Sequence, residues 1–204
     1  VIVYLILCSI NNLHQGHNNG EDITHCFSTC LKYIQAEFTK YSLSLESGAR
    51  CLDGSPAAVF VSKGAINNTI VFFSGNGYCD GTTLSTTLKA VIKGLKIKKE
   101  STDYPDTYDL DTYGILSSDQ QVNPNFWNWT KAYLPYCDGS LFQGTRHSPI
   151  SYRDKTLYFR GANNTLSTFE FLNQKFKMYS SDSIILTGES AGGMAAYIWS
   201  NYLY

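Results

Sequence analysis

Apolar residues in this chain fall into short runs that are separated by turn-forming segments. The runs 57–61 and 69–73 are rich in β-branched and aromatic residues, and the second is typical of a strand buried on both faces of a sheet. A similar run over 183–187 predicts a third strand, and 156–161 predicts a short one. The stretch 131–144 predicts a strand followed by a glycine-bounded loop.

Helical periodicity lies between these runs. Apolar residues spaced by three or four predict helices over His25–Leu43 and Leu166–Lys177, and Thr82–Lys99 is compatible with a further helix. The segment Glu100–Asp119 is polar and rich in turn formers, which indicates a surface excursion. Strands that alternate with helices predict an α/β fold, with a mostly parallel sheet and helices on both of its faces.

Composition narrows the class of protein. With 204 residues, of which 43% are hydrophobic, the chain is long enough to bury the core of one domain. Lys and Arg number 16 against 17 Asp and Glu, without a dense basic run, so we do not expect binding to nucleic acid. The four histidines have no ligand spacing with the cysteines, and we predict neither a metal site nor a cofactor.

The first residues indicate a secretory route. An apolar run over 1–10 is too short to span a bilayer and is followed by polar residues, as in the hydrophobic region of a signal peptide. We predict that 1–16 are the remnant of such a peptide, in a chain whose N-terminus is incomplete. A buried first strand is the alternative interpretation. We expect a secreted monomer without stable membrane insertion.

Three Asn-x-Ser/Thr sequences agree with that route. They lie at Asn67, Asn128 and Asn163, and each is a candidate for N-glycosylation, although an asparagine-rich chain also contains such sequences by accident. The chain has six cysteines, which are compatible with disulfides in a secretory compartment.

The strongest chemical signal follows the strand predicted over 183–187. The chain reads Gly-Glu-Ser-Ala-Gly at 188–192, and small and apolar residues compatible with a helix come next. This is the sequence form of a nucleophile elbow, in which a serine lies on a tight turn from a strand into a helix. We predict Ser190 as the nucleophile, with Gly188 and Gly192 required because side chains there would collide with neighbouring elements. A coincidental loop is the alternative.

A glycine-rich turn, 74–81, follows the buried strand 69–73. Glycines there let backbone N–H groups point outward together, because the φ angles of such a nest are costly for residues with a Cβ. In an α/β-hydrolase this position supplies half of the oxyanion hole, and the N–H after the serine, here that of Ala191, supplies the other half. A simple tight turn is the alternative interpretation of the glycines alone.

Several stretches of the chain together resemble one family, the pectin acetylesterase/Notum family of secreted carboxylesterases. They occur in the family's order, at Cys51–Pro56, Gly75–Cys79, Asn123–Gly144, Leu157–Gly161 and Gly188–Gly193. The resemblance implies an α/β-hydrolase fold and a hydrolase that removes an ester-linked acyl group. In the family, pectin acetylesterases remove acetate from pectin, and Notum removes a fatty acyl group from a signalling protein.

The resemblance also implies roles for individual residues. The matched positions are Ser190 for the nucleophile, the backbone amides of Asn76, Gly77 and Ala191 for the oxyanion hole, and Cys51 and Cys137 for two family cysteines that pair with each other or elsewhere. The family's Gly-Gly-Gly-Trp-Cys reads Gly-Asn-Gly-Tyr-Cys at 75–79, which changes the amide and the aromatic residue expected there. The implied substrate is an acetylated, pectin-like polysaccharide, with an acylated protein as the alternative. A non-catalytic, hydrolase-like binding protein is a further alternative.

The chain lacks a complete catalytic triad in α/β-hydrolase order. In that order an acid and a histidine follow the serine, and the 14 residues after Ser190 include no His, Asp or Glu. We therefore predict that 17–204 are the N-terminal part of one α/β-hydrolase-like esterase domain, incomplete at the C-terminus. Alone it would be nearly inactive, and an unpaired strand edge would destabilise it. His147 is the alternative base, since unrelated folds place the base before the serine.

Overall fold

The described part of the protein begins at residue 37. The computed structural model describes residues 37–75, 83, 85–89 and 101–203. The predicted signal-peptide remnant, the first residues of the predicted helix His25–Leu43 and most of the glycine-rich turn lie outside these ranges. Of the helix predicted over Thr82–Lys99, residues 83 and 85–89 are described; residue 83 is a bend and residues 85–89 are helical.

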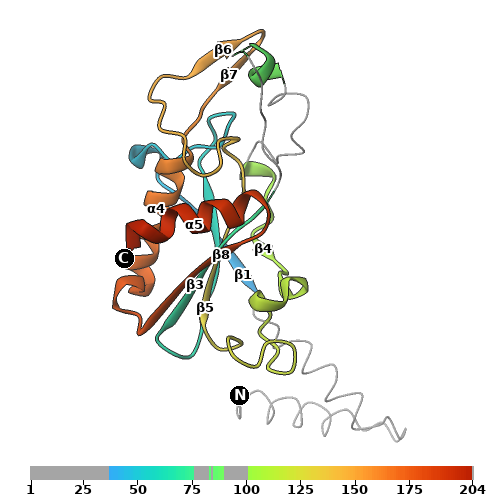
Figure 1. The fold of residues 1–204 in the computed structure, drawn as a ribbon, viewed down its shortest axis with the longest axis vertical. Coiled ribbons are helices and arrows are strands. Elements are labelled where there is room, and N and C mark those ends of the chain that lie inside the picture. Colours follow the sequence, from blue (N-terminus) through green and yellow to red (C-terminus); the bar gives the residue numbers. More distant parts are fainter. Residues whose placement is uncertain (1–36, 76–82, 84, 90–100, 204) are drawn as a thin grey trace, which may run out of the picture. The chain divides into compact units, whose positions relative to one another are not determined.

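A six-stranded sheet forms the centre of the described fold (Figure 1). Its order is β4-β1-β2-β5-β3-β8, with bounds β1 Phe38–Ser42, β2 Ala58–Ser62, β3 Asn68–Phe73, β4 Thr107–Tyr108, β5 Thr130–Leu134 and β8 Ser183–Gly188. The pairs β5·β3 and β3·β8 are parallel, whereas the pairs from β4 to β5 are antiparallel. The predicted α/β class is confirmed, and its parallel half brings the carboxyl ends of β5, β3 and β8 to one edge of the sheet.

The two faces of the sheet pack separate hydrophobic clusters, because successive side chains of a strand point to opposite faces. On β3, Val71 belongs to one cluster and Ile70 to the other. The helices α4 (Gly161–Phe176) and α5 (Ala191–Leu203) pack on the Val71 side. The helix predicted over Leu166–Lys177 is thus confirmed as α4. No helix in the described ranges is long and apolar enough to cross a bilayer.

The helix predicted over His25–Leu43 is wrong for its last residues, which form strand β1. β1 lies antiparallel to β2, with Tyr41 opposite Val59. Residues three apart share one side of a helix but point to opposite faces of a strand. Phe38 and Tyr41 contact the clusters on opposite faces of the sheet. Their spacing of three, which suggested one side of a helix, therefore places one side chain in each cluster.

The segment Glu100–Asp119 is not the surface excursion that its polar composition predicted. It contains the edge strand β4 and two 3₁₀ helices, η2 (Ser101–Asp103) and η3 (Asp111–Leu116). Its residues Leu110 and Leu116 are buried in the cluster on the Ile70 side of the sheet. These apolar side chains of a polar segment therefore pack on the face of the sheet opposite α4 and α5.

The strand predicted over Thr156–Gly161 begins and ends earlier than expected. β7 (Lys155–Leu157) pairs antiparallel with β6 (Ile150–Tyr152), and the two form a ribbon separate from the main sheet. Gly161 is already the first residue of α4. The apolar composition of this stretch reflects the burial of Leu157 in the core rather than a place in the central sheet.

Within the described part of the chain, β8 is an edge strand of the sheet. Its central residues, 184–186, are apolar and only half-buried. The outer side of α5 is apolar as well, and Tyr197 is 80% exposed there. An edge strand leaves N–H and C=O groups without partners in the sheet, so this side of the described fold exposes both backbone polar groups and apolar side chains.

Candidate active site

Ser190 lies on the turn between β8 and α5, where the elbow pattern places it. Its φ is +49°, in the left-handed region that few non-glycine residues adopt. The N–H of Glu189 donates to the carbonyl oxygen of Phe73 at 3.3 Å, and the carbonyl of Glu189 accepts from the N–H of Gly192 at 2.7 Å. These bonds hold Ser190 in a strained backbone conformation with the residue exposed to solvent.

Gly188 and Gly192 are required by close backbone contacts. A Cβ on Gly188 would lie 2.5 Å from the carbonyl oxygen of Phe73, and one on Gly192 would overlap with the same oxygen. Gly193 is less crowded, since a Cβ there would lie 3.3 Å from the carbonyl oxygen of Gly188. The turn is therefore packed tightly against the end of β3, at the carboxyl edge of the parallel strands.

We expect Gly192→Ala to lower the free energy of unfolding by about 2–3 kcal/mol, because the new Cβ overlaps with rigid backbone. Gly193→Ala is the matched control on the same helix. Its single close contact at 3.3 Å is offset by the better helix propensity of alanine, worth up to about 1 kcal/mol. Urea unfolding of both variants measures the difference, and equal losses would contradict the predicted role of Gly192.

The turn after β3 also reaches the elbow directly. β3 and β8 are neighbours in the sheet, with Phe73 opposite Gly188. Two residues later, the N–H of Gly75 donates to Oε1 of Glu189 at 3.3 Å. A Cβ on Gly75 would lie 3.0 Å from the Cβ of Ser190. The structure thus brings the first glycine of the glycine-rich turn against the predicted nucleophile, 115 positions away in the sequence.

Of the three predicted oxyanion donors, the structure describes one. Asn76 and Gly77 lie outside the described residues. Ala191 is buried and is the first residue of α5, so its N–H has no partner within the helix. The N-terminus of a helix carries about half a positive charge, so the start of α5 favours an anion next to Ser190.

Within the described ranges, no base is hydrogen-bonded to Ser190 and no cluster of metal-ligating residues is present. No hydrogen bond joins the Ser190 hydroxyl to another described side chain, and no group of three or more His, Cys, Asp or Glu residues is arranged there to hold a metal ion. His147, the alternative base, is exposed. Its Nδ1 lies 3.3 Å from Nη1 of Arg160, and its carbonyl oxygen accepts from Nη2 at 2.6 Å. The ring of His147 is thus engaged with a guanidinium rather than with a serine.

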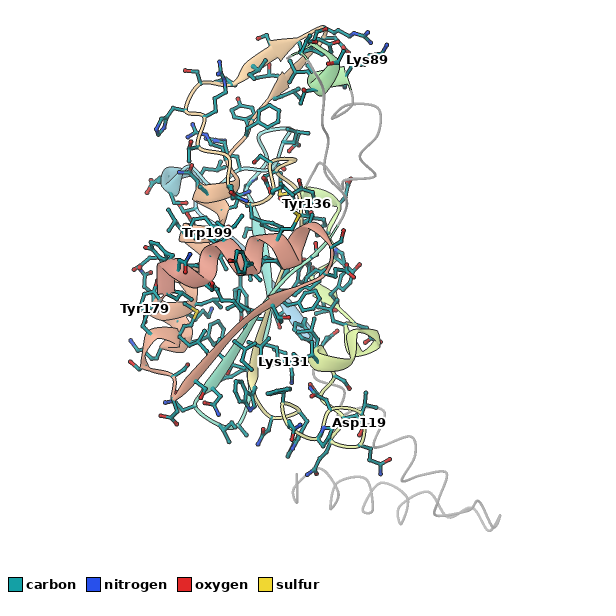
Figure 2. All side chains as sticks on the ribbon, viewed as in Figure 1. Lys89, Asp119, Lys131, Tyr136, Tyr179 and Trp199 are labelled. Carbon is teal, nitrogen blue, oxygen red and sulfur yellow. A yellow bond between two sulfur atoms is a disulfide. The ribbon has the colours of Figure 1, made fainter. Side chains whose placement is uncertain are left out.

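The loop after β5 connects the elbow helix to the core, which the sequence did not predict. Phe142 of this loop is buried, and its ring contacts that of Phe73 with the centroids 5.1 Å apart. The carbonyl oxygen of Phe142 accepts from the indole N–H of Trp199 at 3.0 Å and from the hydroxyl of Thr165 at 3.2 Å. Trp199 belongs to α5, where Figure 2 labels it, and Thr165 belongs to α4, so one backbone carbonyl bridges both helices.

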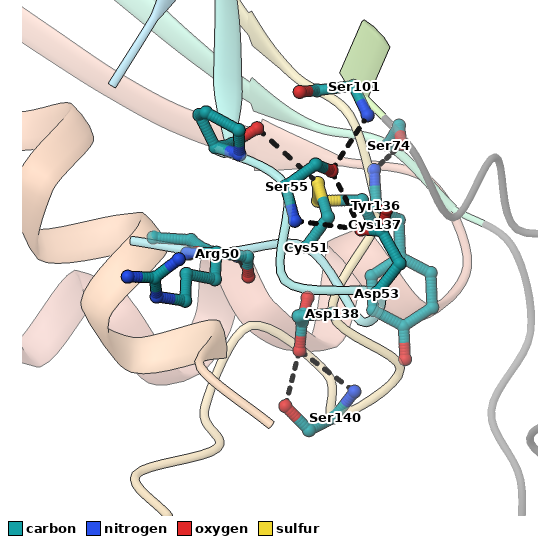
Figure 3. Close-up of a disulfide and its surroundings, with 12 residues drawn as sticks. Arg50, Cys51, Asp53, Ser55, Ser74, Ser101, Tyr136, Cys137, Asp138 and Ser140 are labelled. Carbon is teal, nitrogen blue, oxygen red and sulfur yellow. Dashed lines mark hydrogen bonds between the residues drawn. A yellow bond between two sulfur atoms is a disulfide. The ribbon is translucent and has the colours of Figure 1, made fainter. Parts of the chain in front are cut away.

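A disulfide between Cys51 and Cys137 anchors this loop (Figure 3). The two cysteines are 86 positions apart in the sequence, and both are buried. Beside them, the N–H of Leu52 donates to the carbonyl oxygen of Cys137 at 2.7 Å. The family resemblance left open whether these two cysteines pair with each other or elsewhere. In the structure they pair with each other.

Asp138 follows the disulfide and has an exposed fraction of 0%. Its Oδ2 accepts from the N–H of Ser140 at 2.8 Å and from the Ser140 hydroxyl, whereas Oδ1 has no hydrogen-bond partner in the described part of the molecule (Figure 3). Burial raises the pKa of the Asp138 carboxyl above its ordinary value, and the hydrogen bonds from Ser140 lower it in part. The buried Asp138 carboxyl therefore holds the turn that contains Ser140.

The three predicted glycosylation sites differ in exposure. Asn67 is exposed at the turn before β3, where its Nδ2 donates to the carbonyl oxygen of Ser180 at 2.8 Å. Asn128 is half-buried, and its carbonyl oxygen accepts from the N–H of Ala65 at 2.8 Å. Asn163 is half-buried in the first turn of α4. Asn67 is therefore the most accessible of the three.

Similarity to known proteins extends over most of the chain. A family model described as Pectinacetylesterase matches residues 9–204. Pectin acetylesterase 11 of Arabidopsis thaliana is 36% identical over 160 residues, which are 76% of this chain and 38% of that protein. Palmitoleoyl-protein carboxylesterase NOTUM of Mus musculus is 31% identical over 160 residues, which are 77% of this chain and 30% of that protein.

Solved structures agree with these relatives. The structure of the Wnt deacylase Notum from Drosophila matches with a TM-score of 0.69 at 25% sequence identity, and the match covers 82% of this chain and 47% of that chain. The chain therefore spans less than half the length of each of these three relatives.

Proposed function

Because this chain belongs to the pectinacetylesterase family, we propose that it supplies the nucleophile of a serine carboxylesterase, with Ser190 attacking the carbonyl carbon of an ester-linked acyl group. The observation that carries the proposal is the strained turn at Ser190. The residue is exposed, has a φ of +49°, and lies between the N-terminus of α5 and the end of β3. A serine held this way presents its Oγ to a substrate outside the sheet.

The proposed reaction follows the acyl-enzyme route. A general base takes the proton of Ser190 Oγ while Oγ forms a bond to the acyl carbon, and the carbonyl oxygen becomes an oxyanion. The N–H of Ala191 and the dipole of α5 stabilise that oxyanion, with the amides of Asn76 and Gly77 as the further proposed donors. The tetrahedral intermediate breaks its bond to the leaving oxygen, which takes the proton from the base and departs as the alcohol. Water then gives a proton to the same base and attacks the acyl carbon, the acid leaves, and the proton returns to Ser190 Oγ.

We place the general base and its orienting acid outside these 204 residues. The matches cover less than half of each of the three relatives, and the α/β-hydrolase order puts both groups after the serine. The residues 17–204 are then the N-terminal part of one esterase domain. The isolated chain is accordingly proposed to be nearly inactive, since a serine hydroxyl without a base is a poor nucleophile at neutral pH.

The proposed substrate is an acetylated, pectin-like polysaccharide. The plant pectin acetylesterase is 36% identical to this chain, against 31% for the mouse palmitoleoyl-protein carboxylesterase. Deacylation of a protein is the second candidate, supported by the match to the Notum structure. A non-catalytic, hydrolase-like binding protein is the alternative to both. We propose a secreted monomer, with 1–16 as the remnant of its signal peptide.

The length of the acyl group separates these candidates. We expect kcat/KM for 4-nitrophenyl esters to fall about 10-fold from acetate to octanoate, because a site for acetyl has no room for a longer chain. The assay uses the protein produced from its complete coding sequence. A rise in kcat/KM with chain length would favour the protein deacylase, since each methylene buried in an acyl pocket contributes about 0.8 kcal/mol. No hydrolysis of any ester would favour the binding protein.

A further inference from the structure

The residue that precedes the predicted nucleophile is charged. Glu189 is the only charged residue between Ser183 and Leu203, a stretch that includes all of β8 and α5. It is exposed, and no described Lys or Arg forms an ion pair with it. Its carboxylate is therefore the only charged side chain that β8, the turn and α5 contribute to this part of the molecule.

The position of Glu189 is restrained on several sides. Its N–H donates to the carbonyl oxygen of Phe73 at 3.3 Å, and its carbonyl oxygen accepts from the N–H groups of Gly192 and Gly193 at 2.7 and 3.3 Å. Its Oε1 accepts from the N–H of Gly75 at 3.3 Å. A Cβ on Gly75 would lie 3.0 Å from the Cγ of Glu189, which shows how closely the side chain packs against the turn.

These contacts hold a negative charge next to the reacting group. A Cβ on Gly75 would lie 3.0 Å from the Cγ of Glu189 and also 3.0 Å from the Cβ of Ser190. The N-terminus of α5, with the positive end of its dipole, lies at the same turn. Any ester whose carbonyl carbon reaches Ser190 therefore brings its remaining groups into the field of this carboxylate.

We propose that Glu189 is a specificity-determining residue, which makes the site select uncharged or cationic esters over anionic ones. The inference rests on the proposed role of Ser190 as the nucleophile. Two charges about 8 Å apart near a protein surface change a rate by roughly 2- to 30-fold, depending on the effective dielectric constant. On an acetylated polysaccharide that contains uronic acids, such a charge favours stretches whose carboxylates are esterified and hence neutral.

Two phenyl acetates test this inference on the protein produced from its complete coding sequence. One carries a para-carboxylate and the other a para-trimethylammonium group, and the measured quantity is the ratio of kcat/KM for the cation over the anion. Glu189→Gln removes the charge and keeps an Oε1 that accepts from Gly75. We expect the ratio to fall at least 5-fold in this variant, because attraction and repulsion are both lost. Comparison with wild type cancels the different reactivity of the two esters.

Salt separates an electrostatic role from a structural one. Raising ionic strength from 0.05 to 0.5 M should reduce the ratio in wild type and leave it nearly unchanged in Glu189→Gln, since salt screens exposed charges. The matched control is Glu170→Gln, at an exposed glutamate on α4, which should keep the wild-type ratio and its salt dependence.

The outcomes distinguish the inference from the function on which it rests. Hydrolysis that needs Ser190 but shows the same ratio in wild type and Glu189→Gln would overturn the role of Glu189 and leave the esterase intact. A wild-type protein that hydrolyses neither ester would overturn the proposed esterase, and the role of Glu189 with it. A ratio that falls in Glu189→Gln and not in Glu170→Gln supports both.

Discussion

Ser190→Ala is expected to abolish ester hydrolysis by the protein produced from its complete coding sequence, with a loss in kcat of at least about 10³-fold and up to about 10⁶-fold. The loss is large because without Oγ no acyl-enzyme forms, and only oxyanion stabilisation and binding remain. Acetate release measures the rate. A fluorophosphonate probe, which reacts with activated serines, should label the wild-type protein and not the variant.

Ser200→Ala is the matched control for this experiment. Ser200 is also an exposed serine on α5, and its hydroxyl donates to the carbonyl oxygen of Tyr197 at 2.7 Å, away from the elbow. We expect this variant to keep both hydrolysis and labelling. Labelling that persists in Ser190→Ala would show that another residue is the nucleophile.

The isolated 204-residue chain adds a second comparison. We expect its rate to lie near background, because the described ranges hold no base beside Ser190 and the proposed base lies elsewhere. A chain that hydrolyses as fast as the complete protein would contradict that placement of the base. His147→Ala in the same chain would then show whether the imidazole beside Arg160 performs this role.

Loss of the disulfide is expected to have the largest effect on stability. In the chain-entropy model, closing a loop of 86 residues stabilises the folded state by about 4.5 kcal/mol, so we expect Cys51→Ala/Cys137→Ala to lose about 4 kcal/mol of unfolding free energy. This is a large share of the roughly 5–15 kcal/mol that stabilises a typical domain. The loop that holds Phe142 against Phe73 begins at the disulfide, so the elbow should loosen as well.

Urea unfolding with and without reductant isolates this effect. Reduction should bring the wild-type midpoint towards that of the double variant, while the variant itself should respond much less. If Cys51→Ala/Cys137→Ala unfolded at the wild-type midpoint, the cross-link would not be a source of stability. A variant that is equally sensitive to reductant would show that another disulfide carries the effect.

Local sequence patterns were sufficient to predict the nucleophile elbow and the strands next to it. The apolar run 69–73 is buried between parallel neighbours, and the pattern Gly-x-Ser-x-Gly at 188–192 forms the turn from β8 into α5. Each of these features depends on a few consecutive residues. The backbone demands of a tight turn, such as the crowding at Gly192, select the residue type at the position itself.

Short or irregular segments were predicted less well. Phe38–Ser42 has the spacing of a helix but forms a strand, because pairing with β2 outweighs the local periodicity of so few residues. Leu110 and Leu116 are buried although their segment is polar, because the sheet offers them an uncovered face. In both cases a neighbour that is distant in sequence determined the outcome.

The sequence by itself therefore determined the α/β class, the position of the serine turn and the glycines that the turn requires. Only the tertiary structure decided which residues surround the serine. The hydrogen bond from Gly75 to Glu189 spans 114 positions, and the one from Trp199 to Phe142 spans 57. Neither contact leaves a local pattern, because a hydrogen bond between distant segments depends on how the sheet aligns its strands and not on the residues next to either partner.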